Sequence, residues 1–165
     1  MGKYAQSLDR LFDYRRFISE LLQYMNITIR PVTESDVVLL LPLMEQLGYQ
    51  IDETDLLENI KLHLTSGYAL FVAEISNKLI GFISIHIYRY PHLKDSLSRI
   101  TALCVDADHR SFGIGAKLLA YAEEYINTCG CKLIELTSGI QRENAHRFYE
   151  RQGYSEKRKR FVKEI

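Results

Sequence analysis

A glycine-containing loop between two apolar segments most constrains what this chain can fold into. It lies within VDADHRSFGIGAKLL, residues 105–119, and its centre is Arg110-Ser-Phe-Gly113-Ile-Gly115. The apolar residues before it predict a strand, and the spacing of those after it predicts a helix. Glycines let the backbone approach a ligand, and the first N–H groups of a helix have no partner within the helix. The stretch therefore predicts a site for an anion such as phosphate or pyrophosphate.

Two common nucleotide-binding loops fit this stretch badly. A Walker loop has Lys followed by Ser or Thr after its last glycine, whereas Gly115 is followed by Ala116 and Lys117. A dinucleotide-binding fingerprint needs a small residue where Leu118 stands. A nucleotide-binding protein of either kind is therefore the disfavoured interpretation.

The overall composition is typical of one globular domain. The 165 residues are 47% hydrophobic, which is enough to bury one sizeable core. The 21 Lys and Arg residues balance the 21 Asp and Glu residues, so we expect no binding of nucleic acid or anionic membranes. Three cysteines without an even disulfide framework favour a reducing, cytoplasmic location, and their spacing predicts no metal site. No apolar run approaches the ~20 residues of a membrane span.

The first 24 residues predict an amphipathic helix, because Leu8, Leu11, Ile18 and Leu22 recur at helical spacing. We expect this helix to be an extension that packs on the domain or on a partner subunit. The single domain is expected over residues 25–165. Whether Met25 is the physiological start stays open, and so does a homodimer.

The rest of the chain predicts an α+β domain with a mixed, mostly antiparallel sheet. The expected order is strand, two helices, hairpin, strand, helix, strand, helix and a final strand pair, which departs from regular β–α alternation. The tight turn Ser76-Asn77-Lys78 joins the hairpin, and Gly130 ends the helix that follows the glycine loop. The expected elements cover residues 26–30, 33–48, 53–65, 68–75, 79–90, 99–106, 113–128, 132–138, 142–152 and 154–165.

Two sequence blocks carry a family resemblance. Arg-x-x-Gly-x-Gly after a strand that ends in Val-Asp resembles the acetyl-CoA-binding loop of the GNAT family of N-acetyltransferases. The block Asn144-Ala-His-Arg-Phe-Tyr149-Glu-Arg-Gln-Gly153-Tyr154 resembles the second signature of that family, a helix that ends in Phe-Tyr shortly before Gly-Tyr. The blocks stand in the order of the family, with a helix and a strand between them. The resemblance covers about residues 26–165 and implies the GNAT fold.

The resemblance implies direct transfer of an acetyl group from acetyl-CoA to a primary amine, and it assigns roles to particular residues. Tyr149 is expected to be the general acid that protonates the departing thiolate. Asn144 and Phe148, four residues apart in a helix, are expected to face the cofactor. The pantetheine amides are expected on the strand edge formed by Leu103, Cys104 and Val105. The pyrophosphate is expected on the backbone of Arg110, Ser111, Phe112, Gly113, Ile114, Gly115 and Ala116.

The general base departs from the family pattern. Many members carry a Glu near the position of Thr101, but residues 96–105 contain no carboxylate. A base from another element, a water molecule, or selection of an already neutral amine are the options left open. The alternatives on other elements are His86, Tyr88, His92, Glu45 and Glu135.

The acceptor is expected to be a small-molecule amine. The family usually forms the acceptor site from two segments that correspond to residues 47–54 and 88–97, and these contain acidic and aromatic side chains that suit a cationic amine. Acetylation of protein amino groups is the first alternative. A non-catalytic domain that senses an acyl-CoA is the second, because the usual carboxylate is missing.

Overall fold

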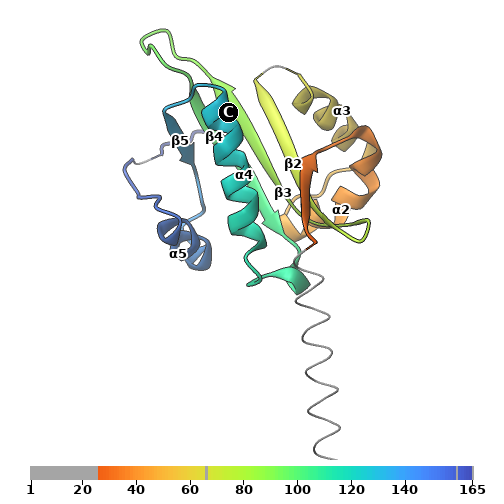
Figure 1. Ribbon diagram of the computed structural model, residues 1–165. Coiled ribbons are helices and arrows are strands. Elements are labelled where there is room, and N and C mark those ends of the chain that lie inside the picture. Colours follow the sequence, from red (N-terminus) through yellow and green to blue (C-terminus); the bar gives the residue numbers. More distant parts are fainter. Residues whose placement is uncertain (1–25, 66, 159, 165) are drawn as a thin grey trace, which may run out of the picture. The chain divides into compact units, whose positions relative to one another are not determined.

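The computed structural model describes residues 26–65, 67–158 and 160–164, and confirms an α+β fold. The expected N-terminal helix lies outside the described residues. The chain falls into two compact units, the first ending at Glu135 and the second beginning at Leu136, and each is described by itself. The elements of Figure 1 are β1 Thr28–Pro31, the 3-10 helix Glu34–Asp36, α2 Val37–Leu47, α3 Glu53–His63, β2 Tyr68–Ile75, β3 Lys78–Tyr88, β4 Leu97–Val105, the 3-10 helix Ala107–His109, α4 Ile114–Thr128, β5 Leu133–Leu136 and α5 Glu143–Arg151.

The five strands form one sheet in the order β1-β2-β3-β4-β5. The pairs β1–β2, β2–β3 and β3–β4 are all antiparallel, which confirms the expected mostly antiparallel sheet. Ser76 and Asn77, between β2 and β3, have φ angles of 48° and 63°. Two consecutive positive φ values are typical of the tight turn that matches the twist of a hairpin, so the predicted turn is confirmed.

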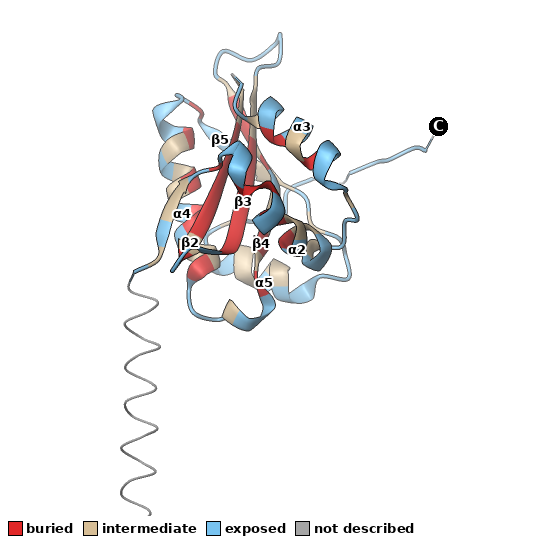
Figure 2. Ribbon diagram, turned by 90° about the vertical axis from the view of Figure 1, so that its right-hand side faces the viewer, coloured by how far each residue is buried: buried red, intermediate tan, exposed pale blue. Residues whose placement is uncertain are grey.

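Helices cover both faces of the sheet, as Figures 1 and 2 show. On one face Phe71 of β2 packs edge-on against Tyr121 and Tyr125 of α4, with ring centroids 4.9 and 5.1 Å apart. Successive strand residues point to opposite faces, so Phe82, next to the Ile83 that pairs with Phe71, points to the face covered by α2 and α3. The core on that face contains Val32, Val37, Leu40, Leu43, Leu56, Ile60, Leu70, Val72, Leu79, Phe82 and Cys104.

Gly81 lets β3, β4 and α4 approach one another closely. A Cβ atom on Gly81 would lie 2.8 Å from the carbonyl oxygen of Cys104 and 3.1 Å from Cδ1 of Leu118. The first distance is too short for real Cβ atoms, so any side chain here would push the two strands apart. The absence of a side chain therefore holds the end of β4 close to the first half of α4.

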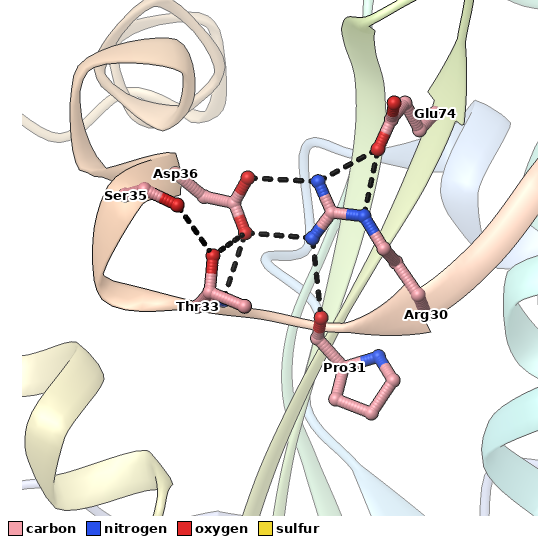
Figure 3. Close-up of polar contacts among 6 residues, drawn as sticks. All are labelled: Arg30, Pro31, Thr33, Ser35, Asp36 and Glu74. Atoms are coloured by element: carbon pink, nitrogen blue, oxygen red, sulfur yellow. Dashed lines mark hydrogen bonds and ion pairs between the residues drawn. The ribbon is translucent and has the colours of Figure 1, made fainter.

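An ion-pair network joins β1, β2 and the start of α2 (Figure 3). The Arg30 guanidinium donates to both carboxylate oxygens of Asp36, at 2.7 and 2.8 Å, and its Nε donates to Glu74 at 2.7 Å. The backbone N–H of Thr33 also donates to Asp36, at 2.8 Å. Because the Asp36 side chain is only 4% exposed, its charge depends on these donors.

The second unit contains α5 and the C-terminal segment. Residues 154–158 and 160–164 form no strand, so the expected final strand pair is wrong. Phe161 and Val162 are 90% and 75% exposed, so these two side chains are not buried in a core. Across the described parts of both units, no helix combines the length and the apolar character needed to cross a bilayer.

Replacing Asp36 with Asn should flatten the acid dependence of stability. Hydrogen bonds from Arg30 hold the pKa of the Asp36 carboxyl below its usual range. The stability that this carboxylate contributes is therefore complete above its unfolded pKa of about 3.9 and is lost as the pH falls through the lower folded value. Urea unfolding should show that Asp36→Asn costs about 2 kcal/mol at neutral pH, and less near pH 2.

Glu34→Gln serves as the control, because Glu34 is exposed and pairs with Lys61 at 3.8 Å. This variant should keep the acid dependence of the wild type. An equally steep loss of stability with acid in Asp36→Asn and the wild type would contradict the account of the network.

Candidate functional site

The carboxylate of Asp106 organises the loop that follows β4. Gln46 of α2 donates from Nε2 to Asp106 Oδ1 at 2.8 Å, and its Oε1 accepts from the backbone N–H of Ala107 at 2.8 Å. His109 donates from Nδ1 to Asp106 Oδ2 at 2.5 Å. The loop is therefore held at its first residue by a side chain from α2 and by its own histidine.

Asp106 remains ionised in this buried position. Burial alone opposes its charge, but hydrogen bonds from Gln46 and His109 lower the pKa of the Asp106 carboxyl below its ordinary value. The ammonium of Lys78, 3.6 Å away, adds to this effect. The carboxylate thus stays an acceptor that fixes both partners across the neutral pH range.

The end of the loop presents backbone donors. Ser111 and Gly113 have φ angles of 68° and 79°, and α4 begins directly after them. The N–H of Lys117 donates to the Gly113 carbonyl at 3.0 Å, so the N–H groups of residues 114–116 precede the first hydrogen bond within the helix. A Cβ on Gly113 would meet nothing within 4 Å, and its φ angle is therefore what favours glycine here. The start of α4 therefore offers N–H groups without a partner in the helix, beside the positive end of the helix dipole.

Arg110 adds a cationic side chain beside these donors. It is exposed, and its Nε donates to the carbonyl oxygen of Val105 at 3.0 Å. The contact holds the guanidinium next to the loop, where the other N–H groups of the side chain can add charge-assisted hydrogen bonds to a phosphate. The loop and Arg110 together have the chemistry of an anion site.

Residues 103–105 form the end of β4, and their side chains and backbone edges have different surroundings. The Cys104 side chain is buried, and its Sγ lies 3.4 Å from the carbonyl oxygen of Leu43, which agrees with a packing role. One backbone edge pairs with β3. On the other side β5 has only four residues against nine in β4, and its Glu135 lies 3.8 Å from Arg99 near the start of β4. Within the described chain, β5 is too short to cover the whole of this second edge.

In the second unit, α5 carries the residues of the other sequence block. Asn144 and Phe148 lie four residues apart, and Asn144 accepts a hydrogen bond from Arg147. The half-buried Tyr149 ring lies 5.2 Å from that of Phe148 and 5.9 Å from that of Tyr154. Burial raises the pKa of Tyr149, so its phenol is protonated at neutral pH.

Two of the expected base candidates are engaged with each other. The Tyr88 hydroxyl donates to Glu135 at 2.8 Å, and Arg99 lies 3.8 Å from the same carboxylate oxygen. Burial, together with the hydrogen bond to Glu135, raises the pKa of Tyr88, so Tyr88 does not ionise to act as a base. His86, also considered, lies flat against Tyr68 with ring centroids 4.4 Å apart.

The remaining candidates lie near the expected acceptor segments. Glu45 is exposed, and it borders a concave surface on the connection between α2 and α3. His92 stacks on Tyr90 in the loop after β3, with centroids 5.4 Å apart. The residues that line the first surface are Leu41, Pro42, Glu45, Tyr49, Gln50, Ile51 and Asp52. This surface therefore combines carboxylates with an aromatic ring, as the sequence predicted for its segment.

The sequence did not reveal the side-chain contacts between residues that are far apart in the chain. Gln46 is 60 residues from Asp106, and no local signal connects them. The hydroxyls of Ser84 and Thr101 lie 2.7 Å apart, and Ser84 lies 3.0 Å from Nε2 of His63. The alternation of β3 placed Ser84 and His86 on one face, but nothing indicated that α3 delivers a histidine there. In the described residues, no three His, Cys, Asp or Glu side chains gather as a metal site requires.

Replacing Gln46 should release the start of the loop. Gln46→Ala removes the acceptor of the Ala107 N–H and a donor to Asp106, each worth about 1 kcal/mol. Hydrogen exchange of the Ala107 amide should become about tenfold faster. Gln46→Glu is the matched variant, because it keeps an acceptor for the Ala107 N–H. It places a second carboxylate beside Asp106, so it should lower the thermal stability of the protein. Unchanged exchange in Gln46→Ala would contradict the role of Gln46.

Comparisons with known proteins agree on one family. The model of the GNAT acetyltransferase family matches residues 38–154. An aminoalkylphosphonate N-acetyltransferase of Salmonella typhimurium is 38% identical over 90 residues, which are 54% of this chain and 58% of that relative. A GNAT family acetyltransferase structure from Staphylococcus aureus has a TM-score of 0.72 at 29% identity, and the match covers 84% of this chain and 98% of that one. The aminoglycoside N-acetyltransferase AAC(6')-Iy in complex with CoA shares the fold, with a TM-score of 0.75 at 17% identity and coverage of 84% and 95%.

The family match includes both sequence blocks, the glycine loop and the segment that begins at Asn144. The chain spans little more than half the length of the Salmonella relative. The matched residues, the sheet order and the solved structures confirm the resemblance seen in the sequence. This chain belongs to the GNAT acetyltransferase family.

Proposed function

We propose that this protein is an N-acetyltransferase that moves the acetyl group of acetyl-CoA directly to a primary amine of a small molecule. The observation that carries the proposal is the anchored loop at the start of α4. Asp106 is fixed by Gln46, and the loop ends in two residues with positive φ angles, the second being Gly113. This arrangement offers a dianionic pyrophosphate several N–H donors with little reorganisation of the backbone.

The residues present fit acetyl-CoA as a co-substrate. The backbone of residues 110–116, with the Arg110 guanidinium, would hold the pyrophosphate. The edge of residues 103–105 would take the pantetheine amides. The family resemblance also assigns Asn144 and Phe148 of α5 to CoA. Acetyl-CoA supplies the thioester whose carbonyl carbon the amine attacks. Tyr149, with its raised pKa, would give its proton to the leaving sulfur.

A small amine is the acceptor that the surroundings favour. The concave surface near α2 and α3 carries Glu45 and Asp52 beside Tyr49, a set that attracts an ammonium group. The Salmonella relative is named for aminoalkylphosphonates, and a structural neighbour is named for aminoglycosides. Both names describe small molecules with primary amines. Protein amino groups and a non-catalytic acyl-CoA sensor are the alternatives that a test must separate from this function.

Thiol release from acetyl-CoA across a panel of amines tests the proposal. The panel should contain 2-aminoethylphosphonate, an aminoglycoside, a polyamine and a lysine peptide. We expect turnover with one of the small amines and none with the peptide. Turnover with the peptide alone would favour protein amino groups. Tight CoA binding in a thermal shift assay, without turnover of any amine, would favour the sensor.

Gly113→Ala should weaken CoA binding, and Gly130→Ala is its matched control. The two glycines lie at opposite ends of α4, with φ angles of 79° and 75°, and neither has an atom within 4 Å of an added Cβ. Each alanine should therefore cost a similar ~1 kcal/mol of stability from the backbone strain alone. Calorimetric titration with CoA should show at least a fivefold loss of affinity only for Gly113→Ala. Equal affinities in the two variants would contradict the loop as the pyrophosphate site.

Tyr149→Phe should lower turnover and leave CoA affinity nearly unchanged. The variant keeps the aromatic ring between Phe148 and Tyr154 but removes the proton that the thiolate needs. General acid catalysis is worth roughly 100-fold or more, so steady-state kcat should fall by about that factor. A kcat equal to that of the wild type would remove Tyr149 from the acid role.

A further inference from the structure

Three polar side chains form a continuous hydrogen-bonded chain from the end of α3 to β4. The hydroxyls of Thr101 and Ser84 lie 2.7 Å apart, and the Ser84 hydroxyl lies 3.0 Å from Nε2 of His63. On its other side, Nδ1 of His63 lies 2.7 Å from the carbonyl oxygen of Asn59. We call His63, Ser84 and Thr101 the His63 relay. It connects helix α3 with strands β3 and β4.

The carbonyl of Asn59 sets the direction of every hydrogen bond in the relay. A carbonyl oxygen only accepts, so Nδ1 of His63 must donate and carry the proton. In a neutral imidazole Nε2 is then an acceptor, and Ser84 donates to it. The Ser84 oxygen in turn accepts from the Thr101 hydroxyl. The outer end of the relay is therefore the Thr101 oxygen, whose lone pairs can accept a further hydrogen bond.

The relay is most deeply buried at its central residue. Ser84 is 6% exposed, His63 is half-buried and Thr101 is exposed. A β-bulge places Thr101, because Ser84 pairs with Ala102 while the next residue of β3 pairs with Ile100. Thr101 is thus the extra residue of the bulge, a position that turns a side chain away from the regular alternation of a strand.

The position of Thr101 along β4 suits the reacting end of an acetyl-CoA molecule held at the loop. Thr101 precedes Asp106 by five residues, which in an extended strand is roughly 17 Å. An extended pantetheine arm has a comparable length. A pyrophosphate on the loop therefore allows the thioester to reach the level of Thr101, on the strand whose edge residues are expected to take the amides.

We propose that the His63 relay accepts the proton that a substrate ammonium must lose before it attacks the thioester, an inference that rests on the proposed acetyl transfer. The ammonium N–H proton passes to the Thr101 oxygen as the Thr101 proton moves to Ser84 and the Ser84 proton moves to Nε2 of His63. The products are a neutral amine and an imidazolium, and both hydroxyls are restored. The amine nitrogen then bonds to the acetyl carbon and the C–S bond breaks. On forming the amide, the nitrogen loses a second N–H proton, which accounts for the proton that the thiolate gains. His63 finally releases its own proton to water.

The surroundings of His63 can hold the positive charge. His63 is the last residue of α3, where the carbonyl groups carry the negative end of the helix dipole and the Asn59 carbonyl accepts directly from the ring. The rings of His63 and Tyr68 of β2 meet edge-on, with centroids 5.3 Å apart, and the ring of His86 of β3 stacks on that of Tyr68 at 4.4 Å. Ser84 is the group that β3 presents to Nε2.

Steady-state kinetics of relay variants test the proposal with 2-aminoethylphosphonate, or with the amine of the panel that the wild type acetylates fastest. Thr101→Val and Ser84→Ala break the relay, and Thr101→Ser restores the hydroxyl. Thr128→Val is the matched control, because Thr128 is also exposed and hydrogen-bonded, to the Tyr125 carbonyl at 2.6 Å, but lies at the far end of α4. At pH 7, kcat/KM should fall about 100-fold in Thr101→Val and Ser84→Ala. It should stay near the wild-type value in Thr101→Ser and Thr128→Val.

The pH profile separates proton transfer from a structural role. The defect of Thr101→Val should shrink toward wild-type activity as the pH approaches ~10, where an alkylamine is neutral without help. A loss that stays equal at all pH values would overturn the relay in favour of packing or substrate binding. Wild-type turnover with an unaffected Thr101→Val would overturn the relay and leave the proposed function standing. A wild type that acetylates no amine would overturn both.

Nuclear magnetic resonance of the full chain, without any substrate, gives a second readout. Proton–nitrogen spectra of labelled histidine should show the Nδ1–H tautomer for neutral His63. In Ser84→Ala the hydrogen bond to Nε2 is lost, so the Nε2 chemical shift should move, whereas Thr128→Val should leave it unchanged. The Nε2–H tautomer in the wild type would reverse the donors and overturn the relay.

Discussion

The buried carboxylate of Asp106 is the interaction on which the candidate site depends. It stands where β4 ends, and its partners come from α2, from the β2–β3 hairpin and from its own loop, through Gln46, Lys78 and His109. Three separate parts of the first unit therefore fix one point of the backbone. A loop fixed in this way can offer its N–H groups to an anion with little loss of entropy on binding.

Strand β4 connects the two parts of the candidate site. Its last residues lead into the anion loop. At its bulge, the Thr101 hydroxyl is hydrogen-bonded to Ser84, which is in turn hydrogen-bonded to His63. Close packing at Gly81 holds the end of the strand near α4. In this view one strand aligns a binding function at one end with a proton-accepting function in its middle. The strand before the loop has no carboxylate, and the proposed relay leads instead from Thr101 through Ser84 to His63 as the proton acceptor.

Local signals in the sequence predicted the elements, and non-local contacts were what it could not show. The turn at Ser76 and Asn77 and the end of α4 before Gly130 follow from the backbone preferences of a few residues, so both are confirmed. The contact of Gln46 with Asp106 joins residues 60 positions apart and leaves no periodic trace. The sequence predicts a strand pair over residues 154–165, but residues 154–158 and 160–164 form no strand, and Phe161 and Val162 are exposed there.

We propose that the loop before α4 binds the pyrophosphate of CoA. Amide spectra of the full, isotope-labelled chain, recorded during a titration with CoA, test it most directly. We expect the largest shifts at the backbone N–H groups of residues 110–116, with smaller shifts along residues 103–105. Saturable binding that leaves the amides of residues 110–116 unmoved would contradict it.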